Sequence, residues 1–322
     1  MIALEGSCQN YHNEINFNKS YAVLPHIDKK MKLNNGMLKR STTAEERGDS
    51  SGDRLLAVLR LFTVEQPEWT VEAAADKLGV SATTSYRYFQ RLTKVGLISP
   101  VSSAGYTLGP AIIQMDRQIQ ISDPMLNAAR GVMAELIEYA AEGSVILLCR
   151  LFHDRVMCVH QVMGQGPQSP VSYERGRLMP LFRGATARII LAHLPTRNLK
   201  AVFARSVKEI AAAGLGNDWT KFRRNMVDLR RSGFCISRSE IDPGRVGVAA
   251  PIFNAERSVL GSLSFVLPDE RADDTLIGRL APLTVAGARE IERAMMRSTT
   301  TRPSSARVKL AQAQWEEQWT AQ

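Results

Sequence analysis

A tight turn between two short helical patterns is the feature that most constrains how this chain folds. Before the turn, apolar residues recur at the three- and four-residue intervals of one helix face: Val71, Ala74, Ala75 and Leu78. Thr70 is placed to cap this helix, Gly79 ends it, and Ser81 caps the next helix only three residues after Leu78. A connection this short makes the two helices cross steeply, as in a helix-turn-helix.

Two further patterns flank this turn. A first helix carries an apolar face made of Leu55, Val58, Leu59 and Phe62. The helix after Ser81 carries an inward face made of Ser85, Tyr88, Phe89 and Leu92. Beyond Gly96, short strands over 97–99 and 105–108 bracket a turn of Ser and Gly, which we interpret as a wing. The segment from Arg54 to Leu108 is therefore predicted to be a winged helix-turn-helix.

The outward face of the third predicted helix suits DNA. Small and hydrogen-bonding side chains lie at its start, where base edges would be met, and cations follow where phosphates would be met. No Asp or Glu occurs from Gly79 through Met115, so these cations have no local anionic competitor. We expect DNA contacts from Thr70, Ser81, Ala82, Thr83, Thr84, Tyr86, Arg87, Gln90, Arg91 and Lys94. The alternative is a small helical subdomain whose outward charges are merely solvated.

Changes of composition divide the chain into five segments. We expect a disordered polar arm, the winged helix-turn-helix, a linker helix, a second domain and a tail rich in Ser, Thr and Arg, over 1–50, 51–109, 110–122, 123–297 and 298–322. The periodic sequence begins only after Asp53, which leaves Met31 or Met37 open as alternative starts. The linker helix has an apolar stripe of Ile112, Ile113, Met115 and Ile119, and a short helix is expected to end near Trp319.

The second domain alternates helical and strand patterns. Asp123 and Pro124 open a helix by N-cap and first-turn proline. Strands are expected over 144–152, 155–162, 234–238, 246–253 and 259–267, and further helices over 184–194, 219–231 and 274–297. Helices flanking an antiparallel sheet make this an α+β domain.

Composition narrows the class of protein. The net charge of +9, from 41 basic and 32 acidic residues, weakly favours a polyanionic partner or an anionic ligand. The four cysteines, Cys8, Cys149, Cys158 and Cys235, form no CxxC pair, which argues against a zinc site and a disulfide framework. We expect no cofactor. The absence of a membrane-spanning apolar run and the polar start predict a soluble, cytoplasmic protein without membrane contact.

The cysteines on apolar strands allow two interpretations. Cys149 and Cys158 fit inert core positions better than sensor positions. Alternation places Cys158 and His160 on one strand face, with His153 nearby, but no third ligand is visible. We therefore expect no metal site.

Three blocks in order resemble the IclR family of bacterial transcriptional regulators, over nearly everything from Arg54 to Arg297. The first is the run 78–87 with 105–109 after the wing; the second is Gly176, Pro180, Leu181, Gly184, Ala185 and 191–195; the third is Gly233, Phe234, Ser239, Glu240, 242–244, 249–251 and 261–264. Three ordered blocks are far more specific than a single helix-turn-helix pattern. The resemblance implies that the second domain is a GAF-like fold that senses a small molecule and helps to assemble dimers or tetramers.

The resemblance also nominates effector contacts at Gly184, Ala185, Ser237, Gly247 and Ser264. The N-terminus of the helix at Gly184 is a seat for a carboxylate, which Arg183 and Arg188 could strengthen. Gly247 stands where family members tend to carry a cysteine, and Val266 where they carry a second serine. Less bulk and fewer polar groups suggest a larger or more apolar ligand, for example an aromatic acid. The alternatives are that Ser264 satisfies strand backbone and that Gly247 forms a bulge.

The leading hypothesis is a regulator that binds a pseudo-palindromic promoter site in double-stranded DNA as a homo-oligomer and controls a catabolic operon in response to a small organic acid. One alternative is a regulator whose second domain is only an oligomerisation scaffold. Another is a GAF-type cysteine redox enzyme or sensor. No Ser/His/Asp grouping, phosphate-binding loop or paired-carboxylate pattern lies beside any cysteine, so we expect that the chain is not an enzyme.

Overall fold

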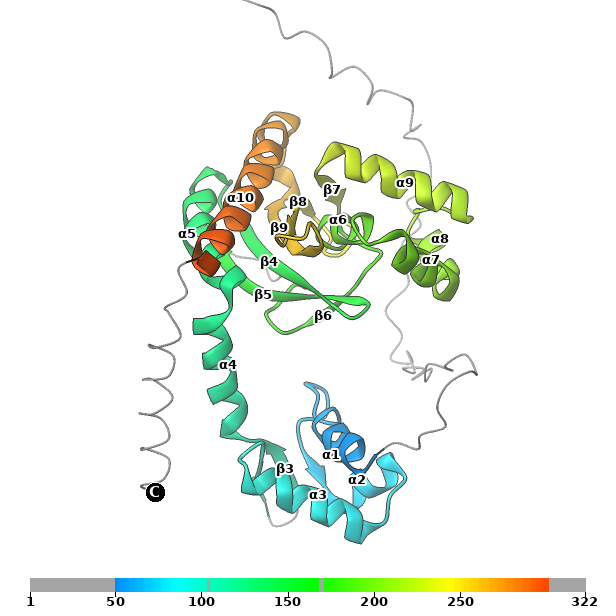
Figure 1. Ribbon diagram of the computed structural model, residues 1–322. Helices are drawn as coiled ribbons and strands as arrows, with labels where there is room; N and C mark the ends of the chain where they lie inside the picture. Colours follow the sequence, from blue (N-terminus) through cyan, green and yellow to red (C-terminus); the bar gives the residue numbers. More distant parts are fainter. Residues whose placement is uncertain (1–49, 103–104, 168–170, 301–322) are drawn as a thin grey trace, which may run out of the picture. The chain divides into compact units, whose positions relative to one another are not determined.

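The computed structural model describes residues 50–102, 105–167 and 171–300 (Figure 1). The predicted arm, apart from Ser50, and the predicted helix near Trp319 lie outside these residues. The described chain forms a winged helix-turn-helix, a linker helix and an α+β domain, which are taken in turn below. In the part that the structure describes, no helix is both long and apolar enough to cross a membrane.

The first region has the predicted helices and wing. Its elements are α1 (Ser51–Leu59), β1 (Trp69–Thr70), α2 (Val71–Leu78), α3 (Ala82–Lys94), β2 (Ile98–Pro100) and β3 (Gly105–Leu108). The strands form an antiparallel sheet in the order β1-β3-β2. The sequence did not predict β1, because a strand of two residues has no period to detect.

The predicted caps fix the turn between α2 and α3. The Thr70 hydroxyl accepts the Ala73 N–H at 3.2 Å, and the Ser81 hydroxyl accepts the Thr84 N–H at 3.2 Å. Gly79 adopts a left-handed φ of +64°, a conformation that costs glycine little. These contacts confirm the predicted helix-turn-helix.

A buried serine joins the two helices behind that turn. The fully buried Ser85 hydroxyl of α3 donates to the backbone carbonyl of Val71, the first residue of α2, at 2.8 Å. Around it lie buried Tyr88, Phe89 and Leu92, as predicted from spacing. The inward face of α3 is thus fixed, and its opposite face is left toward solvent.

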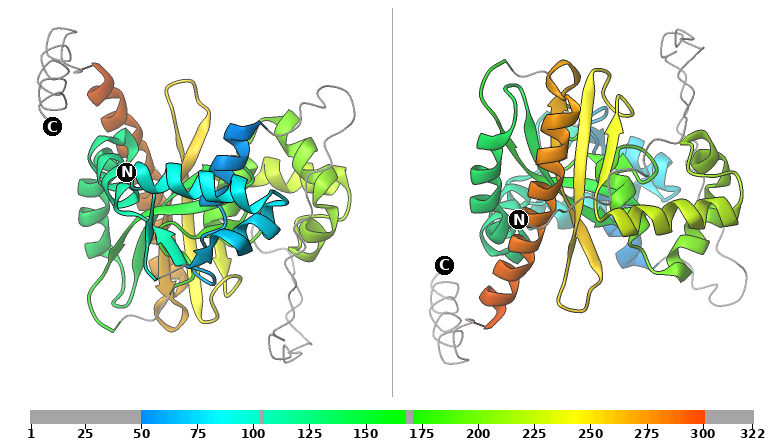
Figure 2. Two further views of the ribbon diagram at one scale, coloured as in Figure 1. Left: turned by 90° about the horizontal axis from the view of Figure 1, so that it is seen from below. Right: turned by 90° about the horizontal axis from the view of Figure 1, so that it is seen from above.

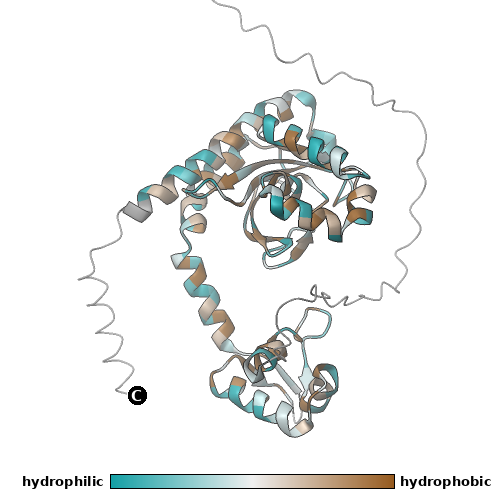
Figure 3. Cartoon of the chain, turned by 45° about the vertical axis from the view of Figure 1, so that its right-hand side comes forward, coloured by the Kyte–Doolittle hydropathy of each residue, from teal (hydrophilic) through white to brown (hydrophobic). Residues whose placement is uncertain are grey.

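The linker helix α4 (Pro110–Ser122) has no buried residue. Its apolar side chains include Ile113, 74% exposed, and Ile119, 53% exposed. Hydrophobic and hydrophilic residues alternate along this helix (Figure 3). An exposed apolar stripe of this kind is typical of a surface that another helix covers.

The α+β domain is built on one six-stranded sheet. Its elements are α5 (Pro124–Leu136), η1 (Ile137–Tyr139), β4 (Val145–Phe152), β5 (Arg155–Met163), β6 (Leu178–Pro180), α6 (Ala185–Ala192), α7 (Thr196–Arg205), α8 (Val207–Ala212), α9 (Trp219–Ser232), β7 (Cys235–Arg238), β8 (Arg245–Phe253), β9 (Val259–Pro268), η2 (Asp269–Arg271) and α10 (Asp274–Thr300). The strand order is β6-β5-β4-β9-β8-β7, and every neighbouring pair is antiparallel.

Helices cover both faces of this sheet (Figure 2). On one face, side chains of α6 to α9 pack with Leu147 and Cys149 of β4. On the other, α5 and α10 pack with Ile146 and Leu148 of the same strand. Alternate residues of β4 therefore enter opposite cores, which explains why this strand reads as a continuous apolar run.

Sequence periodicity missed four elements here: β6, α7, α8 and the short η2. The strand β6 has three residues, too few to show alternation, and α8 has six. Only Leu199 and Val202 of α7 are buried, so its apolar face is narrow. Each element is short enough for tertiary packing to outweigh any local pattern.

A β-bulge corrects the predicted placement of Cys158 and His160. Cys149 pairs with Cys158, whereas the preceding Leu148 pairs with His160, so Val159 is the extra residue. Cross-strand partners share a face, so Cys158 lies with Cys149 in the core under α6, and His160 lies on the opposite face with Leu148. The expectation that Cys158 and His160 share one face was wrong, because simple alternation does not hold across a bulge.

Candidate functional site

The outward face of α3 is the candidate DNA interface. Seven of the predicted contact residues on this helix are exposed: Ala82, Thr83, Tyr86, Arg87, Gln90, Arg91 and Lys94. Among the described residues, none of its three cations has a carboxylate within ion-pair distance. Their charge is therefore available to a phosphate backbone.

Three other predicted contacts have structural roles at the helix starts. Thr70 caps α2 and Ser81 caps α3. The Thr84 hydroxyl lies 2.9 Å from that of Ser81 and is half-buried. These hydroxyls position the N-terminus of α3, and DNA contacts from them remain a prediction.

The candidate effector site is a small cavity where the start of α6 meets β7, β8 and β9. Its volume is about 30 Å³, and it is lined by Tyr173, Gly184, Ala185, Thr186, Ser237, Glu240, Ile241, Asp242, Arg245, Gly247 and Val266. Five of the seven nominated effector residues line it. A cavity of this volume holds one or two water molecules and no aromatic ring.

Arg183 and Ser264 lie elsewhere. Arg183 lines a different cavity of about 340 Å³, beside Leu181 and Arg205. Ser264 is fully buried, and its hydroxyl is 3.0 Å from that of Thr186. Ser264 therefore ties β9 to α6 through side chains, without lining the cavity.

The carboxylate-binding site predicted at the start of α6 is already occupied by side chains of this chain. The Gly184 N–H donates to Glu240 at 3.0 Å, and the Ala185 N–H donates to the Ser237 hydroxyl at 2.8 Å. Arg188 pairs with Glu240 at 2.6 Å and donates to two carbonyl oxygens. The Arg188 charge is thereby engaged within the chain.

Gly247 occupies a regular position in the sheet. It pairs with Ser237 on one side and Val266 on the other, so the interpretation of Gly247 as a bulge was wrong. A Cβ at this position would lie 3.2 Å from the Ser237 hydroxyl oxygen and 3.4 Å from the Ala185 Cβ. The missing side chain thus lets Ser237 reach the helix, and it does not open space for a larger ligand.

Sequence reasoning missed two groups at this site. Glu240 was part of a family block but received no role, and Tyr173 was assigned to no predicted element and received no role. The Tyr173 hydroxyl is buried and has no hydrogen-bond partner among the described residues. Burial raises the pKa of Tyr173 well above its ordinary value, so the phenol stays protonated. It is a donor that a bound acceptor could satisfy.

A winged helix-turn-helix with an exposed cationic helix face, followed by a separate α+β domain, is the architecture of a class of transcriptional regulators. Family models match both regions: "IclR helix-turn-helix domain" matches residues 51–102, and "Bacterial transcriptional regulator IclR C-terminal" matches residues 121–293. The chain belongs to the IclR family of bacterial transcriptional regulators. This result confirms the resemblance seen in the sequence.

Relatives in other bacteria agree. The HTH-type transcriptional regulator KipR of Bacillus subtilis is 26% identical over 65% of this chain and 82% of its own. The p-hydroxybenzoate hydroxylase transcriptional activator of Acinetobacter baylyi is 21% identical over 73% and 88%. These relatives belong to a class that regulates transcription.

A solved structure shows the same fold. An IclR homologue from Microbacterium hydrocarbonoxydans, complexed with 4-hydroxybenzoate, superposes with a TM-score of 0.62 at 19% identity, covering 77% of this chain and all of that one. The predicted α+β architecture with a winged helix-turn-helix and an antiparallel sheet is therefore confirmed.

Proposed function

We propose that this regulator binds a pseudo-palindromic promoter as a homo-oligomer, and that a small organic acid at the start of α6 alters its DNA binding at a catabolic operon. The observation that carries the proposal is the outward face of α3. Exposed hydrogen-bond donors lie there together with three cations that form no ion pair within the described residues. The opposite face of the helix is held by the hydrogen bond of Ser85. One such helix from each of two subunits would enter adjacent major grooves.

The effector half of the proposal rests on donors at the cavity. The Tyr173 hydroxyl lacks an acceptor, and the Gly184 and Ala185 N–H groups point to carboxylate or hydroxyl oxygens supplied by Glu240 and Ser237. An acid effector would take the place of the Glu240 carboxylate on Gly184. Because the cavity is about 30 Å³, the turn that carries Glu240 must move to admit it.

An aromatic acid is our preferred ligand class. The Acinetobacter relative is named for p-hydroxybenzoate hydroxylase, and the Microbacterium homologue was solved with 4-hydroxybenzoate. In this chain, Tyr173, Ile241 and Val266 would surround a ring once the turn had opened. Such a lining of apolar groups with few polar ones is typical of small-molecule sites.

Homo-oligomer formation is proposed to use α4. Its apolar side chains are exposed and none of its residues is buried. Pairing this helix with the same helix of a second copy would remove the stripe from water and bring two recognition helices into one assembly.

A gel shift with the upstream DNA of the gene tests both halves of the proposal. The probe is titrated with full-length protein in the presence of 4-hydroxybenzoate, benzoate, glyoxylate or pyruvate. We expect sequence-specific retardation, and a change in affinity with an aromatic acid. Retardation that competitor DNA of random sequence abolishes would contradict the first half, and a response only to the short acids would contradict the second.

The closed cavity also favours a second candidate, in which the α+β domain is only an oligomerisation scaffold. Glu240 fills the anion seat and no ring-sized space is present beside it. A scaffold would show no ligand-dependent change in melting temperature, whereas a sensor is stabilised by its ligand. Thermal shift with the same acids separates the two.

A further inference from the structure

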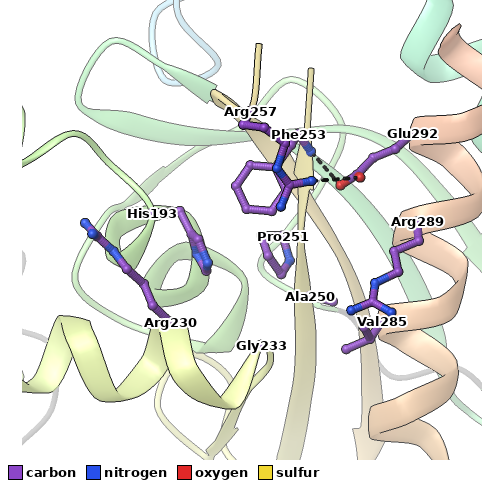
Figure 4. A pocket seen from close by; sticks show the side chains of 10 residues that line it. All are labelled: His193, Arg230, Gly233, Ala250, Pro251, Phe253, Arg257, Val285, Arg289 and Glu292. Carbon is purple, nitrogen blue, oxygen red and sulfur yellow. Dashed lines mark hydrogen bonds and ion pairs between the residues drawn. The ribbon is translucent and has the colours of Figure 1, made fainter. Parts of the chain in front are cut away.

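A third cavity, larger than both described above, lies on another part of the α+β domain, between α9 and α10 (Figure 4). Its volume is about 400 Å³, and its lining contains no residue of the α6 cavity. Ala250 and Pro251 of β8 form its floor, with Val285 of α10 beside them. This volume falls in the range of small-molecule sites.

Three guanidinium groups from three different elements line this cavity. Arg230 comes from α9, Arg257 from the turn between β8 and β9, and Arg289 from α10. Against them stands one carboxylate, that of Glu292. Burial lowers the pKa of His193, the remaining titratable group of the lining, so its imidazole is neutral near pH 7. The cavity therefore carries an excess of positive charge.

Contacts within the chain hold two of these cations in place. Arg230 donates to the backbone carbonyls of Ala192 and Leu194, at the C-terminal end of α6. Arg257 stacks on the Phe253 ring, 4.3 Å from its centroid, and its Nη1 lies 3.4 Å from Glu292 Oε2. Both keep further N–H donors beyond these contacts, because a guanidinium has five.

The single carboxylate of the lining, that of Glu292, already interacts with groups of the chain. Glu292 is buried, and its Oε1 accepts the Phe253 N–H at 2.9 Å while Oε2 faces Arg257. It orients Arg257, and its single negative charge offsets only one of the three guanidinium groups.

Within the described part of the chain, Arg289 is the one cation of this lining without a partner. Among the described residues it has no carboxylate or carbonyl acceptor, although Arg293 and Arg297 on the same helix both pair with Glu290. Its side chain lies across the cavity from Arg230 and His193, over the floor of β8 (Figure 4). A guanidinium in this position suits an incoming anion.

We propose that this cavity binds a small organic dianion, at a site separate from the α6 cavity. One anionic group would bind Arg289 and Arg257, and the other would lie toward Arg230, with the apolar floor beneath the linking carbons. The two negative charges of a dianion match the excess of two positive charges that remains when Glu292 offsets one of the three guanidinium groups. A regulator with two such sites would bind two different metabolites on one domain and respond to both.

Isothermal titration of the full-length protein tests this proposal. The probes are succinate, glutarate and adipate, their monomethyl esters as single-charge controls, and inorganic phosphate as the other simple dianion. We expect at least one dicarboxylate to bind and its monoester to bind at least tenfold more weakly. Phosphate binding without dicarboxylate binding would show a charge-only site and overturn the assignment of an organic dianion.

Matched variants locate the site. Arg289→Gln should weaken dianion binding by about 10- to 100-fold, the value of a lost charge-assisted contact. Arg293→Gln, on the same helix and already paired with Glu290, should leave it unchanged. Equal binding by wild type and Arg289→Gln would overturn the proposal. The proposal would also be overturned if the wild-type protein bound no dianion and Arg289→Gln changed the sedimenting mass. The arginine cluster would then be a contact between copies of the chain.

Discussion

The carboxylate of Glu240 accepts the backbone N–H of Gly184 at 3.0 Å, and its other oxygen pairs with Arg188 at 2.6 Å. A negative charge of the chain itself thus lies at the N-terminus of α6, where the helix dipole and the exposed N–H groups favour an anion. Under the proposed function, an acid effector competes with Glu240 for this place.

Replacing Glu240 by Gln should therefore strengthen acid binding. The amide keeps an acceptor for Gly184 but removes the repulsion and releases the charge of Arg188, so we expect benzoate-type acids to bind about tenfold more tightly, or about 1.4 kcal/mol. Calorimetric titration measures this. Glu135→Gln, an exposed change on α5, is the control. Weaker binding by Glu240→Gln would show that Glu240 helps to hold the ligand.

Removing the Tyr173 hydroxyl should have opposite effects on stability and binding. Without ligand, Tyr173→Phe removes a buried hydroxyl that has no partner, so the free energy of unfolding should stay the same or rise by about 1 kcal/mol. With ligand, the same change should weaken binding, because a donor to the effector is lost. Urea unfolding and titration of one preparation measure both. Unchanged affinity would exclude the hydroxyl from the site.

Replacing Arg87 by Ala should weaken promoter binding by about 1–3 kcal/mol, or roughly 5- to 160-fold, if this side chain meets a base edge. A phosphate contact would instead reduce the slope of log affinity against log salt by about one. Fluorescence anisotropy at several salt concentrations separates these outcomes. Lys208→Ala, an equal loss of charge on α8, serves as the control. Unchanged affinity for Arg87→Ala would refute the assigned recognition face.

The DNA-binding region could be predicted closely from the sequence because its information is local. Spacing placed Tyr88, Phe89 and Leu92 inward, and side-chain chemistry identified Thr70 and Ser81 as caps. Each of these depends on residues within one or two turns of helix. β1 was missed because a strand of two residues exists only through its pairing with β3.

The candidate effector cavity depends on contacts between residues far apart in the chain, and single-sequence patterns do not carry these. Glu240 meets Gly184 across 56 positions, and Ser264 meets Thr186 across 78. The family resemblance nominated five residues that line one cavity, but it suggested more room beside Gly247 than the packing of Ser237 leaves. The bulge at Val159 likewise depends on pairing with β4, so alternation alone misassigned His160.

The buried hydrogen bond from Ser85 to the Val71 carbonyl should control the rigidity of the recognition helix. Ser85→Ala removes the donor in a site without room for solvent, so we expect the winged helix to lose about 1–2 kcal/mol of stability. Chemical unfolding followed by Trp69 fluorescence, with Trp219, Trp315 and Trp319 replaced by Phe, reports on this region, and Ser122→Ala on α4 is an exposed control. An equal loss of unfolding free energy in both variants would contradict the stabilising role assigned to the Ser85 hydrogen bond.

The exposed stripe on α4 should determine oligomeric state. Ile119 is 53% exposed, and we expect it to lie against the same helix of a second copy. Ile119→Glu would place a charge in that apolar contact, so sedimentation equilibrium should show a smaller assembly, and promoter affinity should fall because paired half-sites are no longer bound together. Gln118→Glu adds the same charge one residue away. If both variants keep the wild-type mass, the copies associate through another surface.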